Sequence, residues 1–242
     1  MKISIIVPTL NEVDSIREFL ADLRQRAPNA EVIVVDGSSS DDTAKHAIGS
    51  CDQLLQTTPG RARQMNLGAS AANGNVFWFL HADAAIPYGA VTEIERTLQD
   101  QHVVGGFFRI RFPRERFVYR LSDTIGHYLG LLVRIRYGDH GFFCRRADFF
   151  AAGGYPDLPL FEDAEFYRRM RRRGRTRYVR NKIITSPRRY ERLGPYRLTA
   201  SYLLLSTLYL LHVPIPVLSR IYSRLCVRAE EQPYPERSST RE

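Results

Sequence analysis

Three short stretches place acidic or imidazole side chains where chemistry is usually done. Asp36 ends the apolar run "VIVVD", His81 and Asp83 end "NVFWFLHAD", and the pair Glu162–Asp163 stands in "PLFEDAEFYRRM". The first two stretches read as buried strands that stop at polar residues, and the third reads as the mouth of a helix. Together they suggest ligand binding at strand ends and acid–base chemistry at a helix N-terminus.

The stretch "VVDGSSSDDT" joins a strand-end carboxylate to a glycine-serine turn and a helix start. Asp36 could accept hydrogen bonds from a ribose or a base edge, and the backbone N–H groups of the turn favour an anion. A well-capped turn between strand and helix, with Ser40 or Asp41 as the cap, would have the same composition. The sequence lacks G-x-G-x-x-G and G-x-x-x-x-G-K-[ST], so it predicts neither a dinucleotide fingerprint nor a Walker A loop.

The stretch "LHADAAIP" could hold a hard divalent cation. Mg²⁺ and Mn²⁺ prefer oxygen ligands and often complete their shell with substrate phosphates, so one carboxylate from Asp83 would suffice. His81 lies two residues earlier and would point to the same side of an extended chain. A hydrogen-bonded structural histidine is the alternative interpretation.

Two further stretches have a functional and a structural interpretation. Glu162 and Asp163 could include a general base for an incoming hydroxyl, or could simply complement the helix dipole. In "YGDHGFFCRR", His140 could meet an acceptor hydroxyl, while a tight turn with a hydrogen-bonded histidine is the alternative.

The elements that must position these residues alternate along the first third of the chain. "ISIIVPTL", "AEVIVVD", "CDQLLQT" and "NVFWFLHAD" read as strands, and the segments between them read as helices. This order predicts a doubly wound parallel sheet whose ligands sit at the carboxyl ends of the strands. Further on we expect a strand in "VVGGFFRIRF", a short strand near "GFFCRR", a Gly-Gly turn and a helix that opens at Glu162.

Five stretches occur in the order and approximate spacing of family 2 glycosyltransferases with the GT-A fold: "SIIVPTLNE", "VIVVDGSSSDDT", "GRARQMNLGA", "LHADAAIP" and "FEDAEFYRRMRRRG". The sequence resembles that family from about Lys2 to Arg192. H-A-D stands where most relatives read D-x-D, as in a bacterial subgroup of short enzymes. The resemblance implies an α/β fold of GT-A type, with a Rossmann-like, mostly parallel sheet and helices on both faces.

On this basis we divide the chain into a glycosyltransferase domain over 1–195, a C-terminal apolar helical extension over 196–228 and a flexible tail over 229–242. The domain would have a nucleotide-binding half over about 1–100 and an acceptor half over about 101–195. The tail is polar and contains proline, so we expect it to fray.

Position by position, the resemblance implies roles for individual residues. Those matched to the nucleotide are Pro8, Thr9, Glu12, Asp36, Ser38, Arg61, Asn66 and His81. Asp83 matches the metal-binding acid, Asp163 the catalytic base, and Glu162 is its partner in the E-D pair. Arg188 and Arg189 match, more loosely, a basic segment that contacts diphosphate or acceptor, and His140 is a further acceptor candidate.

His81 is the main departure from the family pattern. Histidine in place of the first acid removes a charge from the site, so metal affinity could be weaker than in relatives. We expect Asp83 to bind Mg²⁺ or Mn²⁺ together with substrate phosphates, and His81 not to be a metal ligand.

Composition narrows the surroundings of the protein. The net charge of +9 over 242 residues implies attraction to nucleic acid, acidic lipid or a phosphorylated small molecule. Three scattered cysteines with no C-x-x-C pair argue for a reducing compartment and against a disulfide framework or a zinc ribbon. The N-terminus lacks the features of a signal peptide, so a cytoplasmic protein is expected.

The segment from Leu198 to Ser219 carries no Asp, Glu, Lys or Arg. It is long enough to span a bilayer, but Pro214 and Pro216 would break a helix near its end. A helix that packs on the domain or lies on the membrane surface fits better, so peripheral contact with the inner face of the membrane is an open option.

The sequence therefore predicts a metal-dependent, inverting transferase that moves a sugar from a nucleotide-diphosphate sugar to an acceptor hydroxyl. UDP is expected because it is common in the family, and the acceptor is open, with a lipid-linked one among the options. One alternative is a catalytically silent relative that binds nucleotide sugars, with His81 as its main support. The other is a basic polyanion-binding protein, against which stands the lack of any nucleic-acid-binding motif.

Overall fold

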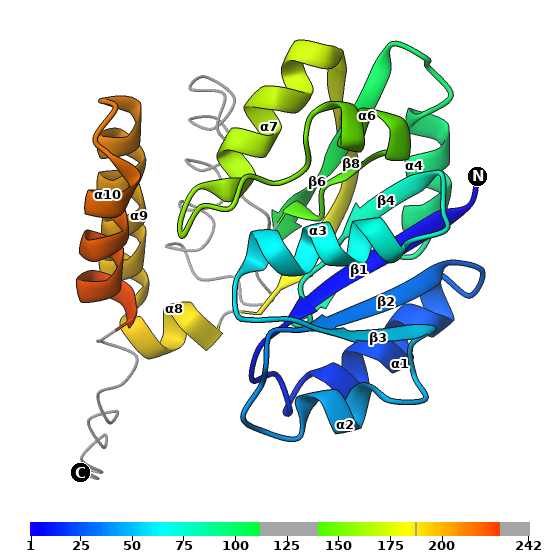
Figure 1. The fold of residues 1–242 in the computed structure, drawn as a ribbon, viewed down its shortest axis with the longest axis horizontal. Coiled ribbons are helices and arrows are strands. Elements are labelled where there is room, and N and C mark those ends of the chain that lie inside the picture. The colour runs from blue at the N-terminus through cyan, green and yellow to red at the C-terminus, as the bar shows by residue number, and fades with distance from the viewer. Residues whose placement is uncertain (112–139, 187, 228–242) are drawn as a thin grey trace, which may run out of the picture.

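The computed structural model describes residues 1–111, 140–186 and 188–227, with only the backbone of Val227 (Figure 1). The expected tail over 229–242 lies outside these residues. The strands are β1 (Ile3–Thr9), β2 (Glu31–Asp36), β3 (Gln53–Gln56), β4 (Val76–Phe79), β5 (Ala84–Ala85), β6 (Val103–Arg111), β7 (Phe143–Arg145) and β8 (Arg175–Thr185). Among the described residues they form one sheet in the order β3-β2-β1-β4-β7-β6-β8-β5.

The first half of the sheet is parallel, as the run of β-branched residues predicts. β1 lies between β2 and β4, and β2 also pairs with β3, all in parallel. Every residue of β1 and β4 is buried, because helices cover both faces of these strands. Their carboxyl ends lie on the side of the sheet that faces the C-terminal helices (Figure 1).

The second half of the sheet mixes directions. β7 is antiparallel to both β4 and β6, β5 is antiparallel to β8, and β6 and β8 are parallel. The short strand, the turn at Gly153–Gly154 and the helix that opens at Glu162 are confirmed. The sheet is therefore mostly parallel, and the expected mixed α/β architecture is confirmed.

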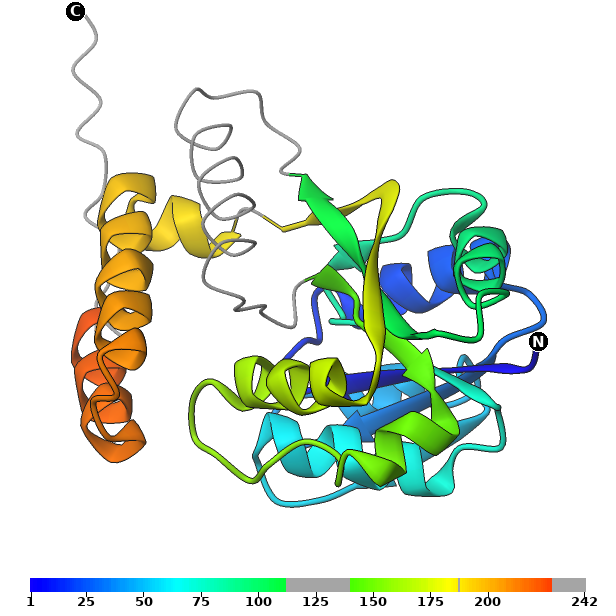
Figure 2. The ribbon, with the colours of Figure 1, turned by 90° about the horizontal axis from the view of Figure 1, so that it is seen from above.

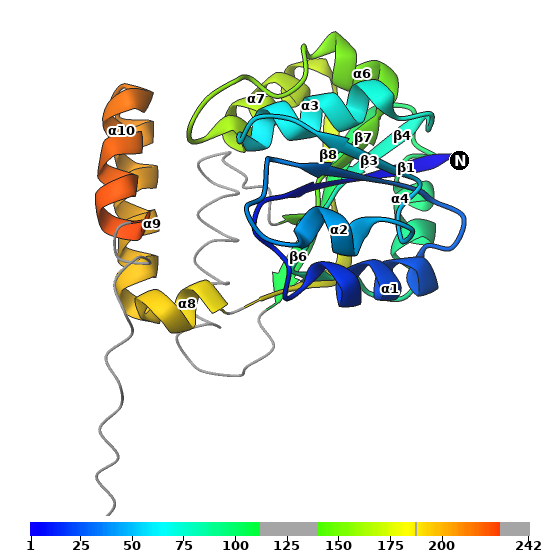
Figure 3. The ribbon, with the colours of Figure 1, turned by 60° about the horizontal axis from the view of Figure 1, so that its bottom comes forward.

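The helices are α1 (Ile16–Arg26), α2 (Thr43–Ala47), α3 (Arg61–Ala71), α4 (Ala90–Thr97), α6 (Arg146–Ala151) and α7 (Glu162–Arg173). One core cluster joins α1 and α4 to one face of the sheet, and a second joins α3, α6 and α7 to the other. Figure 3 shows α1 and α2 below the strands and α3, α6 and α7 above them. Helices on both faces are thereby confirmed.

The arginine-rich stretch from Arg168 to Lys182 is divided between a helix and a strand. The helix ends at Arg173, and Arg175–Thr185 is the long strand β8. β8 forms its pairs with β6, some 70 residues earlier, from Val103↔Arg175 to Arg111↔Ile184. Such non-local pairing overrides the local preference of an arginine-rich stretch.

Three helices and a short π-helix follow the sheet: α8 (Arg188–Leu193), α9 (Pro195–Leu210), α10 (Ile215–Tyr222) and η2 (Ser223–Val227). The expected break occurs between α9 and α10, where His212 has φ 60° and Pro214 precedes α10. α9 and α10 lie side by side at one end of the molecule (Figure 2). Leu205 and Leu218 of this pair pack against Phe161 and Ala164 of the α7 region. No helix in the described ranges is both long and apolar enough to cross a membrane.

The cysteines are shielded. Cys144 and Cys226 are buried and Cys51 is half-buried, and all three are thiols. Burial raises the pKa of the Cys51 thiol and raises that of Cys144 well above its usual value. These thiols therefore stay protonated and react slowly.

Candidate functional site

The turn after β2 holds Asp36 in a dense set of hydrogen bonds. Asp36 is only 1% exposed, and its carboxylate accepts from the backbone N–H of Ser39 at 2.9 Å and from the hydroxyl of Thr9 at 3.4 Å. Ser38 has a left-handed φ of 62°, and its hydroxyl donates to the carbonyl of Thr57 at 2.9 Å. A left-handed non-glycine residue is uncommon and often marks a functional loop.

The loop after β1 lies against this turn. Pro8 and Thr9 are the last residues of β1, paired with Val35 and Asp36 of β2. Asn11 also has a left-handed φ, 55°, and its side-chain oxygen accepts from the backbone N–H of Ser40 at 2.9 Å. The strand ends therefore form one surface.

Glu12 continues the loop after β1. Its backbone N–H donates to the Thr43 hydroxyl at 2.7 Å, and its carboxylate accepts from the Ser15 hydroxyl at 2.8 Å. Glu12 therefore links the loop to the starts of α1 and α2, at the same edge as Thr9 and Asp36.

Gln64 ties the two loops together, and sequence reasoning missed it. Its amide donates to the carbonyl of Thr9 at 2.7 Å and to that of Val35 at 2.8 Å, and the residue is 3% exposed. The side chain also lies against Gly37, where an added Cβ would come within 3.0 Å of its nitrogen. Nothing in the sequence sets Gln64 apart, because the same helix also carries the polar residues Arg61, Arg63 and Asn66.

Arg61, the first residue of α3, connects the strand-end surface to the start of α7. Its guanidinium lies 3.5 Å from the Glu162 carboxylate and 3.3 Å from the Asp163 carboxylate. On another side its Nη2 lies 2.6 Å from Nε2 of His81. Arg61 of α3 is thus in direct ionic contact with two acids of α7, about 100 positions later in the chain.

This contact fixes the state of the histidine ring. A guanidinium can only donate hydrogen bonds, so Nε2 of His81 is the acceptor and the ring proton sits on Nδ1. The Arg61 side chain is 44% exposed, whereas those of Glu162 and Asp163 are 8% and 9% exposed. The partly open guanidinium of Arg61 therefore faces two sheltered carboxylates.

Asp83 lies two residues after His81 in the chain. It is half-buried and follows His81 in a turn that the backbone N–H of Ala84 closes on the carbonyl of His81 at 3.1 Å. The next residues form β5, which pairs with the end of β8. Within the described ranges, no three His, Cys, Asp or Glu side chains gather as a metal-binding cluster.

Other candidates make structural contacts in this conformation. Both amide atoms of Asn66 bond to the backbone of Tyr155, at 2.8 and 2.9 Å. The ring Nδ1 of His140 lies 3.1 Å from the carbonyl of Phe108, in a turn where a Cβ on Gly141 would collide with Ile183. Their expected roles toward nucleotide and acceptor stay predictions.

Arg188 and Arg189 are the first two residues of α8. Arg188 is exposed. Arg189 donates to the hydroxyls of Tyr202 at 3.2 Å and Tyr222 at 2.5 Å, and so ties α8 to α9 and α10. A role of these residues toward diphosphate or acceptor also stays a prediction.

Comparisons with known proteins agree with this arrangement. The sequence model described as Glycosyl transferase family 2 matches residues 4–154. An undecaprenyl-phosphate 4-deoxy-4-formamido-L-arabinose transferase of Photorhabdus laumondii is 26% identical over 156 residues, which are 60% of this chain and 48% of that protein. The chain spans between 33% and 48% of the length of the curated relatives that it matches.

Solved structures show the same fold. A mannosyltransferase from Pyrobaculum calidifontis, in complex with GDP-Man and Mn²⁺, superposes with a TM-score of 0.66 at 18% identity, over 95% of this chain and 72% of that one. Glucosyl-3-phosphoglycerate synthase from Mycobacterium tuberculosis, with Mn²⁺ and UDP, gives 0.62 at 17% identity, over 88% and 81%. With the family match over most of its length and a sheet of GT-A type, the chain belongs to glycosyltransferase family 2.

Proposed function

We propose that this glycosyltransferase moves a sugar from a nucleotide-diphosphate sugar to an acceptor hydroxyl, with inversion at the anomeric carbon. The observation that carries the proposal is the contact of Arg61 with Glu162 and Asp163. It brings the acids of α7 to the strand-end surface, where open α/β sheets bind their ligands. A leaving group and a base can then act on the same sugar.

The nucleotide would lie over the ends of β1 and β2. Asp36 and Ser38 would address the base, and Pro8, Thr9 and Glu12 would line the base and ribose. The left-handed residues Asn11 and Ser38 support this role, because they lie in the loops after β1 and β2, which are hydrogen-bonded to each other. Uridine is favoured by the structural relatives described as complexes with UDP or UDP-sugars.

A divalent metal fits Asp83. Mg²⁺ and Mn²⁺ accept a single protein carboxylate when phosphates fill other positions, and three solved structures of relatives are described with Mn²⁺. When bound, the metal would neutralise charge on the departing diphosphate. His81 would take no part as a ligand, because its Nε2 already accepts from Arg61; it would address the nucleotide instead.

Asp163 would remove the proton from the acceptor hydroxyl, with Glu162 beside it. Arg61 stabilises the ionised carboxylates, which a base needs before it accepts a proton. One base acting opposite the leaving group gives an in-line displacement, and hence inversion. Arg61 also presents a positive charge where the diphosphate would develop negative charge.

The acceptor would be lipid-linked, with the enzyme at the membrane periphery. The relative from Photorhabdus is named for an undecaprenyl-phosphate substrate, which supports this choice. His140, Arg188 and Arg189 would belong to the acceptor half over about 101–195. The helical extension over 196–228 would contact the membrane surface.

The first experiment is thermal unfolding with UDP, GDP, TDP and CDP, each with and without Mn²⁺. A ligand at 100 times its Kd adds about 2.7 kcal/mol, which raises Tm by roughly 5–10 °C for a chain of this size. We expect UDP with Mn²⁺ to give the largest rise. Asp83→Asn should remove the Mn²⁺ dependence, and Asp22→Asn, a remote acid paired with Arg26 on α1, should not.

The second experiment follows release of UDP from UDP-glucose and UDP-N-acetylglucosamine. Release without an Asp163 dependence would contradict the assigned base, and binding without release would favour the catalytically silent alternative. Stabilisation by any polyanion but by no nucleotide would overturn the proposal and favour the polyanion-binding alternative.

A further inference from the structure

The outer side of α9 is an exposed apolar stripe. Residues three, four and seven positions apart share one side of a helix. Six apolar residues at this spacing are exposed along the length of α9 and just beyond it: Tyr196, Ala200, Leu203, Leu204, Leu210 and Leu211. Leu204 is 47% exposed and Leu211 is 68% exposed.

The fold does not need this stripe. The opposite side of α9 makes the internal contacts, where Leu198 and Leu205 are buried and Tyr209 packs against the α7 region. A helix that keeps large leucines on the side it does not pack has a second surface to cover. The stripe is therefore available for a partner.

Arginines surround the stripe and point to the nature of that partner. The segment from Arg188 to Cys226 contains six arginines and one acid, Glu191. Five of the six arginines are exposed: Arg188, Arg192, Arg197, Arg220 and Arg224. A second copy would bring the same positive charges face to face, whereas an anionic bilayer surface offers both apolar depth and negative headgroups.

We propose that the outer face of α9 docks on an anionic membrane surface. The leucines would enter the boundary between headgroups and acyl chains, and the exposed arginines would contact lipid phosphates. This surface does not depend on the assigned base or donor, so it stands whether or not the proposed transfer reaction does.

The test is flotation of the full chain with vesicles of phosphatidylcholine, with and without phosphatidylglycerol. We expect flotation with the anionic vesicles, weakened by salt. Leu204→Glu/Leu211→Glu should lower bound protein by at least about tenfold. Ile48→Glu is the matched control, because Ile48 is an equally exposed apolar residue, 67% exposed, at the end of a different helix, α2.

Two results would overturn this proposal. One is equal flotation of the double variant and the wild type. The other is a failure of the wild type to float, whether or not it forms a dimer that the double variant loses. A far-UV spectrum and thermal unfolding of each variant confirm that it is folded.

A separate observation concerns the inner side of α9. Phe161 directly precedes Glu162 and Asp163 and has a left-handed φ of 64°. Its ring stacks on Tyr209 with centroids 4.4 Å apart and planes 13° from parallel. The Tyr209 hydroxyl donates to Glu165, which also pairs with Arg168 at 2.9 Å.

The tyrosine remains a donor over the whole physiological range. Burial, followed by the bond to Glu165, raises the pKa of Tyr209 to about 12. α9 therefore holds the first turn of α7 at two points, one before the acid pair and one after it. An uncommon backbone conformation at Phe161 persists only where its surroundings enforce it.

The geometry points to Tyr209 as a positioning residue for Asp163. Its stacked ring would keep Phe161 left-handed, and this conformation sets the direction in which the first turn of α7 presents the acid. The inference rests on the proposed role of Asp163 as base.

The test compares kcat and KM for UDP release in three variants. Tyr209→Leu should lower kcat by about 10- to 100-fold at unchanged KM, since small displacements of a reacting group have effects of this size. Tyr209→Phe keeps the stack and should restore most of kcat. Tyr196→Leu, which changes a 73% exposed tyrosine of the same helix, should behave as wild type.

The outcomes separate the two ideas. If Asp163→Asn lowers kcat and Tyr209→Leu does not, the positioning role is wrong and the base assignment stands. If Asp163→Asn itself has no effect, the proposed function fails first. Equal losses in Tyr209→Phe and Tyr209→Leu would also reject the role of the stacked ring.

Discussion

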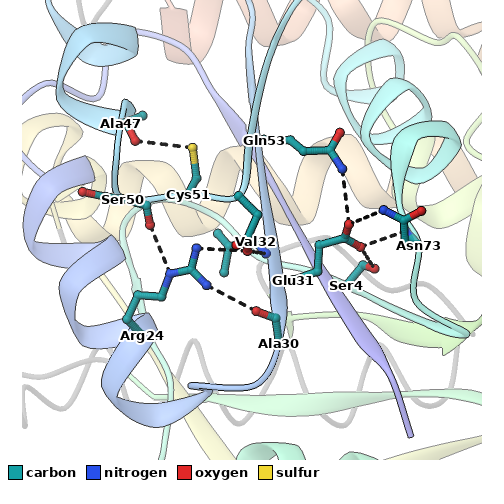
Figure 4. Close-up of polar contacts among 11 residues, drawn as sticks. Ser4, Arg24, Ala30, Glu31, Val32, Ala47, Ser50, Cys51, Gln53 and Asn73 are labelled. Atoms are coloured by element: carbon teal, nitrogen blue, oxygen red, sulfur yellow. Dashed lines mark hydrogen bonds and ion pairs between the residues drawn. The ribbon is translucent and has the colours of Figure 1, made fainter.

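The two edges of the parallel sheet use similar side chains in opposite ways. At the amino end of β2, the Glu31 carboxylate accepts from Asn73 at 2.7 and 2.8 Å, from Gln53 at 3.2 Å and from the Ser4 hydroxyl (Figure 4). Nearby, Arg24 donates to the carbonyls of Ser50 and Ala30 (Figure 4). At this edge both Glu31 and Arg24 make several hydrogen bonds within the fold.

At the carboxyl edge, one arginine serves two carboxylates and a histidine. The distances from Arg61 to Glu162 and Asp163 are 3.5 and 3.3 Å, longer than typical charge-assisted hydrogen bonds. Left-handed residues also gather near this edge, at Asn11, Ser38 and Phe161. A carboxylate that accepts several hydrogen bonds stabilises the fold, whereas the longer contacts of Arg61 and the left-handed loops favour the carboxyl edge as the place where a ligand binds.

The largest expected effect comes from removing the proposed general base, Asp163, at the carboxyl edge. Asp163→Asn keeps the shape of the side chain but removes the proton acceptor, so transfer should fall by roughly 10²- to 10⁴-fold. Stabilisation by UDP with Mn²⁺ should be retained, since the donor does not need the base. Asp157→Asn, in the loop before α7 and paired with Arg63 at 3.0 Å, is the control and should keep full activity.

The next effect contrasts two arginines on the first turn of α3. Arg61→Ala leaves two sheltered carboxylates without this cation, and at about 1.5–3 kcal/mol for a charged hydrogen bond activity should fall by roughly 10- to 150-fold. Arg63→Ala breaks an exposed pair with Asp157, so it should change stability by less than about 1 kcal/mol and activity hardly at all. Equal rates of UDP release in Arg61→Ala and Arg63→Ala would contradict a special role of the Arg61 contacts at the carboxyl edge.

The smallest effect concerns the amino edge. Burial raises the pKa of Glu31, but the hydrogen bonds from Ser4 and Asn73 together lower it by more than burial raises it. The pKa of Glu31 therefore lies below its ordinary value of 4.5. A group with a lowered folded-state pKa stabilises the fold above that ordinary value and loses this contribution as pH falls through the folded value.

Glu31→Gln should therefore lower the free energy of unfolding by about 1 kcal/mol at pH 7, a small value because the carboxylate is partly open to solvent. The difference from wild type should shrink below pH 4.5. Denaturant unfolding at both pH values measures it, with the exposed Glu18→Gln as control. UDP release should not change, since this network lies at the opposite end of the strands.

The sequence predicted what depends on local pattern. The four β-branched residues in "VIVV" predicted a buried parallel strand, which is observed. The polar residues after this strand predicted ligand binding at its carboxyl end. β8 was not predicted, because the strand is defined by its pairing with β6, which is distant in the chain. Strand pairing over such a separation cannot be read from periodicity.

The site shows the same division. Asp36 and Asp163 were predicted as polar residues at element ends and Arg61 through the family resemblance. The contact of Arg61 with Asp163 depends on how α3 and α7 pack on one face of the sheet. The role of Asn66 illustrates the limit, since its amide is engaged by the backbone of Tyr155, 89 positions away. The stack of Phe161 on Tyr209 had no sequence signal, because neither residue belongs to a polar pattern.

The shielded cysteines have a practical consequence for following the C-terminal helices. Cys51, Cys144 and Cys226 are at least half-buried, and burial suppresses the thiolate of Cys51 and Cys144. A cysteine introduced at the exposed position of Leu204 or Leu211 would react with a maleimide dye much faster than these three. The protein is therefore ready for site-specific fluorescence, and a polarity-sensitive label on α9 would report its surroundings without removal of any native thiol.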